Sequence, residues 1–550
     1  MSYLIRKIQL NSPFWVPRVI VVAVCGLIFL GLGSAPLTDI DEGAFAEASR
    51  EMLLRGDWVS PWLLDAPRYD KPVLIHWLQM ISFSIFGVNV WAARLPSALA
   101  GVIWIALIGL WAKLIALRFL SYERAQSVSL WTIVLAGTSI GILAISRSST
   151  ADALLNALLV ASLLTLWKSF YHRTDDRFSV RGWARWSALW SGLGLLTKGP
   201  IAILIPMMGA LVAAATQGKE GWIRLRVVIS DVGAWLIFTS VALPWYLLQF
   251  EAQGMAFVRS FFGTHNLGRF VDTMHGFSAG YAYYPIWIGV ALLPWLPVVV
   301  WVIFTLIRTG FWREKSVSMC WGIFIFVIIF FSISATKLPH YGFYGLSGFL
   351  VIAGILLEKY ATSDRKINLI ITIQALFLSL LIILLSFTPL WWEHLPTRIN
   401  DPYYRQVLED AQIIIREITW WFLLPGFLAL VVAFCRRIEV VMLGGFVFSA
   451  TLYAGIVLPV MHAFRAPLVN AASAIRLETS EVITWRLNAP SLSFEAKRVI
   501  KPGDPGPGMV VVMHIKDHSL LVDKLRESKS QQLTVHRIWS QGGIQVVRII

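Results

Sequence analysis

Two adjacent carboxylates, Asp41 and Glu42, lie in a polar segment just beyond the first hydrophobic stretch of the chain. The segment spans residues 34–71 and ends in the run Arg68-Tyr-Asp-Lys. Carboxylates are costly to place beside lipid, so a cluster of them next to a hydrophobic span suggests chemistry. Such a group could accept a proton or stabilise a developing positive charge. The structural alternative is that Asp41 caps a helix over residues 42–54.

Other polar residues recur where hydrophobic stretches begin or end. They are Asp70 and Lys71, Asp152, Lys198, His265 and Arg269 in the loop 250–282, and Lys337 with Tyr341. Lysine and arginine at such positions could hold a phosphate, arginine by two directed bonds. Each also has a plainer interpretation. Asp152 could complement a helix dipole, lysines extend toward head groups, Tyr341 could belong to an interfacial belt, and His265 could be an ordinary interfacial histidine.

The composition is that of a membrane protein. Of 550 residues, 57% are hydrophobic and 14% are charged, and the mean hydropathy is +0.67; soluble domains have about 25% charged residues. The net charge of +15 falls mainly in short loops between spans, as in polytopic proteins, so we expect no nucleic-acid partner. The basic residues before the first span, with no cleavage site after it, predict a retained anchor. The three cysteines form no spacing motif and predict neither a disulfide nor a metal site.

Hydropathy predicts about thirteen crossings, with a cytoplasmic N-terminus. They lie near 14–33, 97–117, 126–146, 151–171, 183–197, 200–217, 229–249, 283–307, 317–334, 340–358, 367–390, 418–435 and 439–461. The apolar stretch 72–87 is too short to cross, because about 16 residues of helix cover about 24 Å of a ~30 Å core. We therefore expect a juxtamembrane or re-entrant helix there.

This topology places the polar segments 34–71, 147–152, 250–282 and 337–341 on one external face, together with Lys198. We expect a transmembrane domain over residues 1–462, whose external loop 34–96 carries juxtamembrane helices. Residues 463–550 are expected to form a small α/β domain on the same side. In it, strand-like runs lie at 510–513 and 544–550, a helical stretch at 517–528, and a turn or linker at 501–508.

The motifs resemble those of polytopic GT-C glycosyltransferases that use lipid-phosphate sugars, such as lipid A aminoarabinose transferases and protein O-mannosyltransferases. The Asp-Glu pair is followed by Phe45, Ala46 and Glu47, then by Arg50-Glu-Met and Gly56-Asp-Trp, and Arg94-Leu-Pro-Ser closes the match. Two positions depart from the aminoarabinose transferases, which usually have Glu where this chain has Asp70 and often Arg where it has Ala44. These departures bear on the sugar and the acceptor.

The resemblance implies an α-helical polytopic membrane protein with a GT-C fold. It also implies an inverting transferase of the bacterial inner membrane whose active site faces the periplasm. The donor would be a monosaccharide on undecaprenyl phosphate and the acceptor lipid A, as in 4-amino-4-deoxy-L-arabinose transfer. Asp41, Glu42 and Asp152 would be catalytic, and Lys71, Arg269, Lys198, Lys337 and Tyr341 would bind the donor phosphate. No cofactor is expected to be obligatory, although Asp70 and His265 could hold a divalent ion.

Two alternatives stay open. The enzyme could glycosylate a protein or another envelope glycan instead of lipid A. A lipid-sugar flippase belongs to another class, but transporters favour internal repeats and broken helices at the midplane. This sequence has no evident repeat, and its charged residues gather at span ends on one side.

Overall fold

The computed structural model describes residues 16–39, 41–171, 177–271, 280–361, 365–399, 401–418, 438–527 and 533–550. The N-terminal half contains α2 (Val16–Phe29), α3 (Glu42–Arg55), β1 (Trp62–Leu63), β2 (Ala66–Pro67), α4 (Leu74–Phe86), α5 (Val90–Ala116), α6 (Tyr122–Gly137), α7 (Ile140–Ser146), α8 (Asp152–Tyr171), α9 (Arg177–Lys198), α10 (Ile201–Gln217), α11 (Lys219–Ile229), α12 (Val232–Val258), the π-helix η1 (Arg259–Gly268) and α13 (Arg269–Val271).

The second half continues with α14 (Tyr283–Ala291), α15 (Leu296–Thr309), η2 (Phe311–Arg313), α16 (Lys315–Ile333), η3 (Pro339–Tyr344), α17 (Leu346–Ala361), α18 (Arg365–Ser386), α19 (Thr388–Trp392), η4 (Pro396–Arg398), α20 (Pro402–Ile418), α22 (Ile438–Leu452), η6 (Tyr453–Val457) and α23 (Leu458–Ile475). The chain ends in a small domain with β3 (Val482–Thr484), α24 (Pro490–Ala496), β4 (Lys501–Pro502), β5 (Val510–His514), η7 (Ile515–Asp517), α25 (His518–Glu527), β6 (Val535–Gln541) and β7 (Ile544–Ile549).

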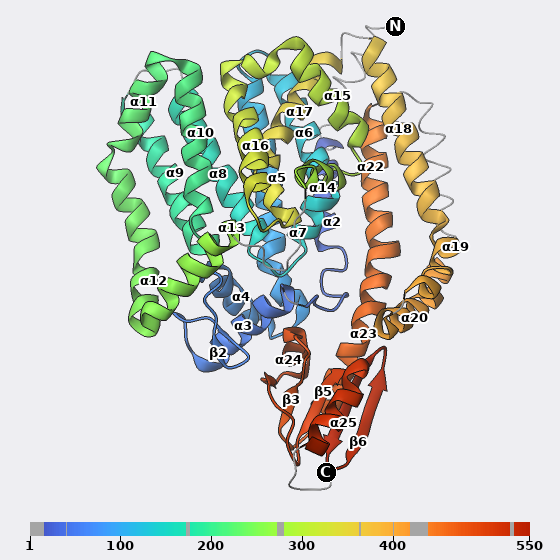
Figure 1. Ribbon diagram of the computed structural model, residues 1–550. Helices are drawn as coiled ribbons and strands as arrows, with labels where there is room; N and C mark the ends of the chain where they lie inside the picture. The colour runs from blue at the N-terminus through green and yellow to red at the C-terminus, as the bar shows by residue number, and fades with distance from the viewer. Residues whose placement is uncertain are drawn as a thin grey trace.

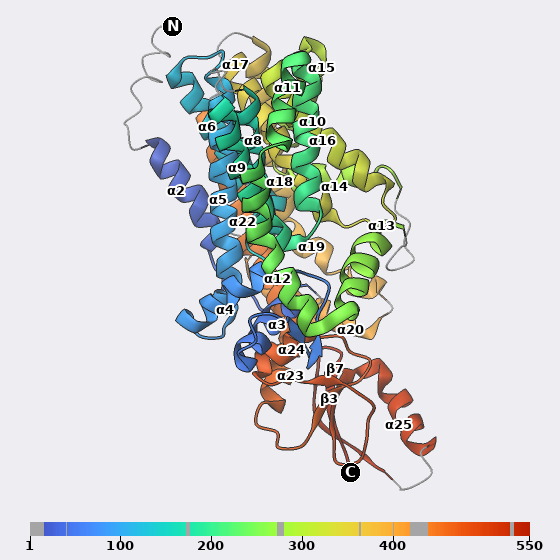
Figure 2. The same ribbon diagram turned by 90° about the vertical axis from the view of Figure 1, so that its left-hand side faces the viewer.

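Most of these helices run side by side in one long bundle, with α3 and α4 at its lower end and the small domain below them (Figure 1; Figure 2 gives the side view). Within the described residues, five helices are long and apolar enough to cross a membrane, and the pair α6 and α7, bent by 70°, forms a sixth candidate. The helices α4, α10 and α15 are also apolar but shorter. The predicted crossing 418–435 lies almost entirely outside the described residues, as does Cys435.

Several observed helices differ in extent from the predicted crossings. The helix α5 begins at Val90 because Asn89 caps it by accepting a hydrogen bond from the amide of Ala92. The predicted span 126–146 breaks between α6 and α7, and the span 283–307 breaks between α14 and α15. The helix α4 has 13 residues, about 20 Å of helix, and packs beside α3 and α5.

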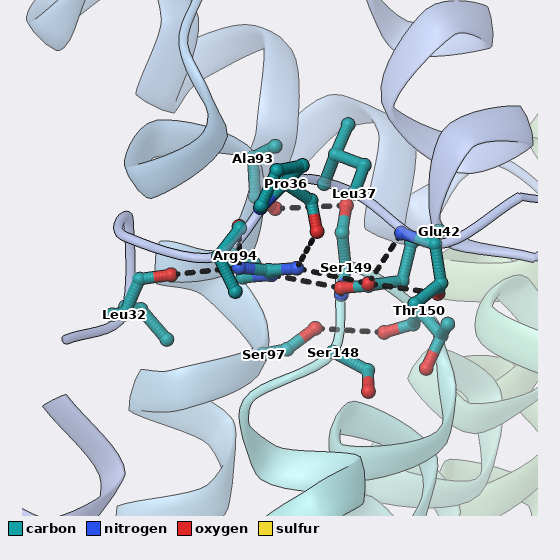
Figure 3. A network of polar contacts seen from close by, with 12 residues as sticks. Leu32, Pro36, Leu37, Glu42, Ala93, Arg94, Ser97, Ser148, Ser149 and Thr150 are labelled. Atoms are coloured by element: carbon teal, nitrogen blue, oxygen red, sulfur yellow. Dashed lines mark hydrogen bonds and ion pairs between the residues drawn. The ribbon is translucent and has the colours of Figure 1, made fainter. Parts of the chain in front are cut away.

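Two buried arginines hold the segment that leads from α2 to Asp41. Arg147 donates to the carbonyls of Leu27, Ile28 and Leu30. Arg94 donates to the carbonyls of Leu32, Ala35 and Pro36 (Figure 3). A helix end leaves carbonyls without partners, and the guanidinium groups supply them where water is scarce. The segment 27–36 is thereby tied to the bundle.

The small domain is a five-stranded sheet in the order β4-β3-β5-β7-β6. The strands β3, β4 and β5 are parallel to one another, and β5, β7 and β6 pair antiparallel. One face packs on α23 and α24 through residues such as Leu468, Leu492 and Val512, and the other packs on α25 through Leu521. The predicted strands at 510–513 and 544–550 correspond to β5 and β7, whereas β3 and β6 had no clear sequence signal.

Candidate active site

The two carboxylates at the start of α3 have opposite environments. Asp41 is exposed, and its carboxylate forms no hydrogen bond or ion pair with any described residue. It occupies the N-cap position but makes no side-chain capping bond, so the capping alternative does not account for it. Glu42 is 3% exposed and is held on all sides. Asp41 is therefore the carboxylate that is available to a ligand.

Glu42 anchors α3 to the bundle. Its oxygens accept from Arg94 Nε at 2.8 Å and Nη2 at 2.9 Å, from the Ser149 amide at 2.8 Å, and from the Thr38 amide at 3.0 Å (Figure 3). Burial on its own raises the pKa of Glu42, but Arg94 and the two amides outweigh it and lower that pKa. Glu42, expected beside Asp41 as a catalytic group, thus has contacts that suit a support.

A polar network continues from Glu42 beneath α3. The hydroxyl of Ser149 accepts a hydrogen bond from Gln79 Nε2 at 2.7 Å, and Ser49 donates to Gln79 Oε1 at 2.6 Å. The same Ser49 hydroxyl meets His76 Nδ1 at 2.7 Å. His76 and Gln79, the polar residues of the apolar stretch 72–87, therefore join α4 to α3 rather than face lipid.

Asp152 gathers a second cluster at the start of α8. Lys198, at the end of α9, lies 2.5 Å from Asp152 Oδ1, and the Tyr344 hydroxyl donates to the same oxygen at 3.1 Å. The ring of His340 lies 3.8 Å from it. Lys198 also lies over the ring of Tyr341, 5.4 Å from its centroid. The predicted residues Asp152, Lys198 and Tyr341 thus meet in space.

Asp70 gathers a third cluster. Arg68 Nε donates to Asp70 Oδ1 at 2.5 Å, and Lys71 Nζ lies 3.4 Å from Oδ2. Burial alone raises the pKa of Asp70, but Arg68 and Lys71 outweigh it and hold that pKa well below its usual range. His265 also lowers the pKa of Asp70, so η1 lies within electrostatic reach. Two cations against one carboxylate leave a positive surplus that favours an anion.

Apolar contacts and backbone bonds join these clusters. Phe45 of α3 packs with Ile75 of α4 and Ala151, the residue before Asp152. Phe261 of η1 lies against Gly199, next to Lys198. The Ala335 amide donates to the Phe270 carbonyl at 3.0 Å. The segments that carry Lys337 and Arg269 are therefore adjacent.

Two predicted phosphate ligands have less defined surroundings. Lys337 Nζ donates to the Ser334 carbonyl at 2.9 Å, which holds the ammonium beside its own segment. Arg269 is the first residue of α13, and its side chain lies outside the described part of the structure.

The residues suggested for a divalent ion do not form a metal site by themselves. The described residues contain no group of three or more His, Cys, Asp or Glu side chains that could hold a metal. Asp70 already pairs with Arg68 and Lys71. A metal ion held by the two predicted residues would have only the Asp70 carboxylate and the His265 ring as ligands.

Three neighbours of the predicted site residues were not singled out from the sequence. Arg68 lies two residues before Asp70, and His340 lies within the run 337–341, so both were visible in the motifs. Tyr344 follows that run, and its hydrogen bond to Asp152 joins residues 192 apart. A contact of that separation has no local sequence signal.

An apolar groove of about 670 Å³ runs beside the site between α4, α5, α8 and α9. Its lining includes Leu78, Leu99, Leu158 and Trp190. Leu154, two residues from Asp152, also lines it. The groove thus brings an apolar surface next to the charged clusters.

Known glycosyltransferases are similar to this chain in sequence. The family model described as dolichyl-phosphate-mannose-protein mannosyltransferase matches residues 70–245. An undecaprenyl phosphate-alpha-4-amino-4-deoxy-L-arabinose arabinosyl transferase from Enterobacter sp. (strain 638) is 25% identical and aligns over 95% of this chain and 91% of its own. A transferase of the same description from Pseudomonas fluorescens (strain Pf0-1) is 30% identical, over 60% of this chain and 55% of the relative.

The fold is that of a solved transferase. The crystal structure of ArnT from Cupriavidus metallidurans bound to undecaprenyl phosphate superposes with a TM-score of 0.78 at 19% sequence identity, covering 98% of both chains. This agreement extends to the membrane bundle and the small domain, so the predicted fold class is confirmed. The chain therefore has the GT-C fold of this solved transferase, and its sequence is similar to those of the ArnT-like glycosyltransferases.

Proposed function

We propose that this protein transfers a monosaccharide from undecaprenyl phosphate to lipid A, with 4-amino-4-deoxy-L-arabinose as the leading donor sugar. The names of the full-length relatives support this donor and carrier. The observation that carries the proposal is the exposed carboxylate of Asp41, which has no partner among the described residues and lies at the same end of the bundle as two lysine-bearing clusters.

The cations would hold the carrier phosphate. We expect Lys71 with Arg68, and Lys198 with Lys337 and Arg269 from the adjacent segments, to stabilise the charge that grows on the phosphate as it departs. Asp152 orients Lys198, and Tyr341 lies beneath the same ammonium. The apolar groove suits the first prenyl units, because its lining is apolar and includes Leu154, two residues from Asp152.

Asp41 would act on the acceptor. An acceptor oxygen attacks the anomeric carbon from the face opposite the phosphate, the bond from that carbon to the phosphate oxygen breaks, and the configuration inverts. If the acceptor is a hydroxyl, Asp41 takes its proton. If the acceptor is a phosphate oxygen, Asp41 orients it and stabilises the positive charge on the sugar.

We further propose that the site faces the periplasm. The basic loops predicted from the sequence to be cytoplasmic, such as 219–226 at α11, lie at the opposite end of the bundle from α3 (Figure 1). Undecaprenyl-linked sugars and lipid A would then meet at the outer surface of the inner membrane.

A protein acceptor is the second candidate, favoured by the match of residues 70–245 to the protein mannosyltransferase family. The test offers purified enzyme the undecaprenyl-linked aminoarabinose donor with lipid A and with an envelope protein extract in parallel, and follows the products by mass spectrometry. Sugar on lipid A alone supports the leading proposal, sugar on protein alone supports the second, and donor movement across a vesicle without product supports a flippase.

The same assay tests the role of Asp41. We expect Asp41→Asn to lower turnover by about 100-fold or more, the usual contribution of a general base, while the variant inserts and purifies normally. Glu123→Gln, an exposed residue at the start of α6, is the control and should keep wild-type turnover. Wild-type turnover of Asp41→Asn would remove Asp41 from the mechanism.

A further inference from the structure

We propose that the C-terminal domain positions Asp41 for catalysis through a clamp made by Arg465, Asp39 and Ser491, which makes Arg465 a positioning residue. The inference rests on the proposed role of Asp41. The proposal gives a role to the C-terminal domain, whose function could not be inferred from its sequence.

The clamp grips the residues just before Asp41. Arg465 of α23 donates from Nε to the Leu37 carbonyl at 2.9 Å, and its Nη2 binds the Asp39 carboxylate and the Ser491 hydroxyl. The Ser491 amide in α24 donates to Asp39 Oδ1 at 2.9 Å. Arg465, Asp39 and Ser491 are largely or fully shielded from solvent, so water competes weakly for these bonds.

An apolar contact accompanies the clamp. Phe494 of α24 packs in a cluster with Leu37, Ala46 of α3 and Phe83 of α4, and its ring centroid lies 6.0 Å from that of Phe83. At the rim, Lys501 pairs with Asp65 of the loop 56–71. The domain therefore touches α3, α4 and both ends of the polar segment 34–71.

Gly43 shows how closely the two parts approach. A Cβ atom at this position would lie 2.7 Å from the Ser491 amide nitrogen and 3.1 Å from Asp39 Oδ1. The first distance is closer than a Cβ atom tolerates and the second is unusually short. The nearer atom is backbone, so α24 or α3 would have to move. The first turn of α3, which begins directly after Asp41, leaves no space for an additional methyl group beside α24.

These contacts complete a series along one segment. Arg147 holds the carbonyls at 27–30 and Arg94 those at 32–36, both from the bundle. Arg465 holds Leu37 and Asp39, and it comes from the helix that leads into the C-terminal domain. The position of Asp41 therefore depends on a part of the chain more than 400 residues away.

The test compares Arg465→Met, Arg465→Lys and Gly43→Ala with a control, Lys524→Ala, which removes an exposed ion pair of the same domain with Asp504. Each variant is assayed for kcat and for the KM of the donor, and hydrogen exchange of residues 36–45 is measured on the whole protein. Misplacing a reacting group by about 1 Å can cost about 100-fold in rate. We therefore expect Arg465→Met to lower kcat by about tenfold or more.

If the proposal holds, the KM of Arg465→Met for the donor stays within about twofold of the wild-type value, because the proposed phosphate ligands lie outside the clamp. Hydrogen exchange of residues 36–45 becomes faster than in the wild type. Arg465→Lys should give an intermediate kcat, since an ammonium can reach Asp39 without also holding Leu37 and Ser491. Gly43→Ala should act in the same direction as Arg465→Met, and Lys524→Ala should match the wild type.

Wild-type kcat and exchange in Arg465→Met would overturn the proposal, as would an equal loss in Lys524→Ala. If Arg465→Met does not insert, Gly43→Ala decides by the same criteria. If the wild-type protein does not turn over the donor, the proposed function fails, whereas the exchange measurement still decides whether the clamp holds the segment.

Discussion

Asp41 and Glu42 are adjacent in sequence, but their carboxylates have different environments. The side chain of Asp41 faces solvent at the entrance to α3, while Glu42 is buried against Arg94 and two backbone amides. A carboxylate that is already saturated with donors is a poor base, because its lone pairs are committed. We therefore propose that Asp41 is the reactive group and that Glu42 anchors α3.

We expect Glu42→Gln to destabilise the protein. The change removes a negative charge beside Arg94, which is 3% exposed, and breaking a buried ion pair on one side costs about 3 kcal/mol. Thermal unfolding of the purified protein in detergent measures the loss. Glu123→Gln, the exposed control, should unfold at the wild-type temperature. An unchanged unfolding temperature for Glu42→Gln would contradict the anchoring role.

His76 gives the stability a pH dependence. It is fully buried, its Nδ1 meets Ser49, and its Nε2 has no partner among the described residues. Burial and the nearby charge of Arg68 lower the pKa of His76 to about 3, so the folded protein holds the ring neutral. Unfolded chains bind the proton below about pH 6.5, and stability should fall as the pH drops from about 6.5 toward 3, by at most about 1.4 kcal/mol per unit.

His76→Asn should remove that part of the slope. Unfolding temperatures at pH 5 and pH 7 measure it, and the wild type should lose more on acidification than the variant does. His536→Asn, at an exposed position on β6, is the control and should keep the wild-type slope. Equal slopes in all three proteins would show that His76 titrates normally.

At the scale of elements, helices approach one another most closely at glycines. A Cβ atom on Gly348 of α17 would lie 2.4 Å from the Cys320 carbonyl oxygen of α16 and 3.1 Å from its Cα. These are backbone atoms, so the two helices cannot yield locally. The helix α16 ends just before the segment 334–337, and α17 follows η3, so their packing holds Lys337 and Tyr341.

Gly348→Ala should therefore destabilise the protein by about 1–3 kcal/mol, the usual cost of overpacking. The matched control is Gly182→Ala in α9, where no atom lies within 4 Å of the added carbon and helix propensity favours alanine by about 1 kcal/mol. Unfolding temperatures of the two variants should move in opposite directions. A shift of Gly348→Ala in the same direction as the control would contradict the close approach.

The sequence predicted elements well where the signal was local. Hydrophobic runs gave α8, α10 and α16 close to their observed bounds, and the stretch 72–87 contains the short helix α4. Helix breaks such as that after Gly137 were missed, since the apolar pattern continues through them. The predictions for the site likewise succeeded where the sequence signal was local and failed where it was not. Motifs singled out Asp152, Lys198, Tyr341 and Arg94, but the partners Tyr344 and Arg465 depend on contacts across the fold that composition does not encode.

At the scale of the whole molecule, the place of the basic helix α11 bears on how the bundle is oriented in the membrane. The exposed basic helix α11 and the C-terminal domain lie at opposite ends (Figure 1). Positive loops favour the cytoplasm, so the domain, α3 and Asp41 should share the periplasmic side. A periplasmic site would meet lipid-linked sugars after they have crossed the membrane, and it would need no passage for the acceptor through the bundle.

Labelling of cysteines introduced into the wild-type chain tests this orientation. Lys524→Cys lies on α25 and Lys219→Cys at the start of α11, and both positions are exposed. A membrane-impermeant maleimide added to intact spheroplasts should label Lys524→Cys at once and Lys219→Cys only after permeabilisation, because the bundle places them on opposite sides of the bilayer. The wild-type chain, with its three native cysteines, sets the background. Labelling of Lys219→Cys in intact cells would invert the topology and place Asp41 in the cytoplasm, away from lipid A.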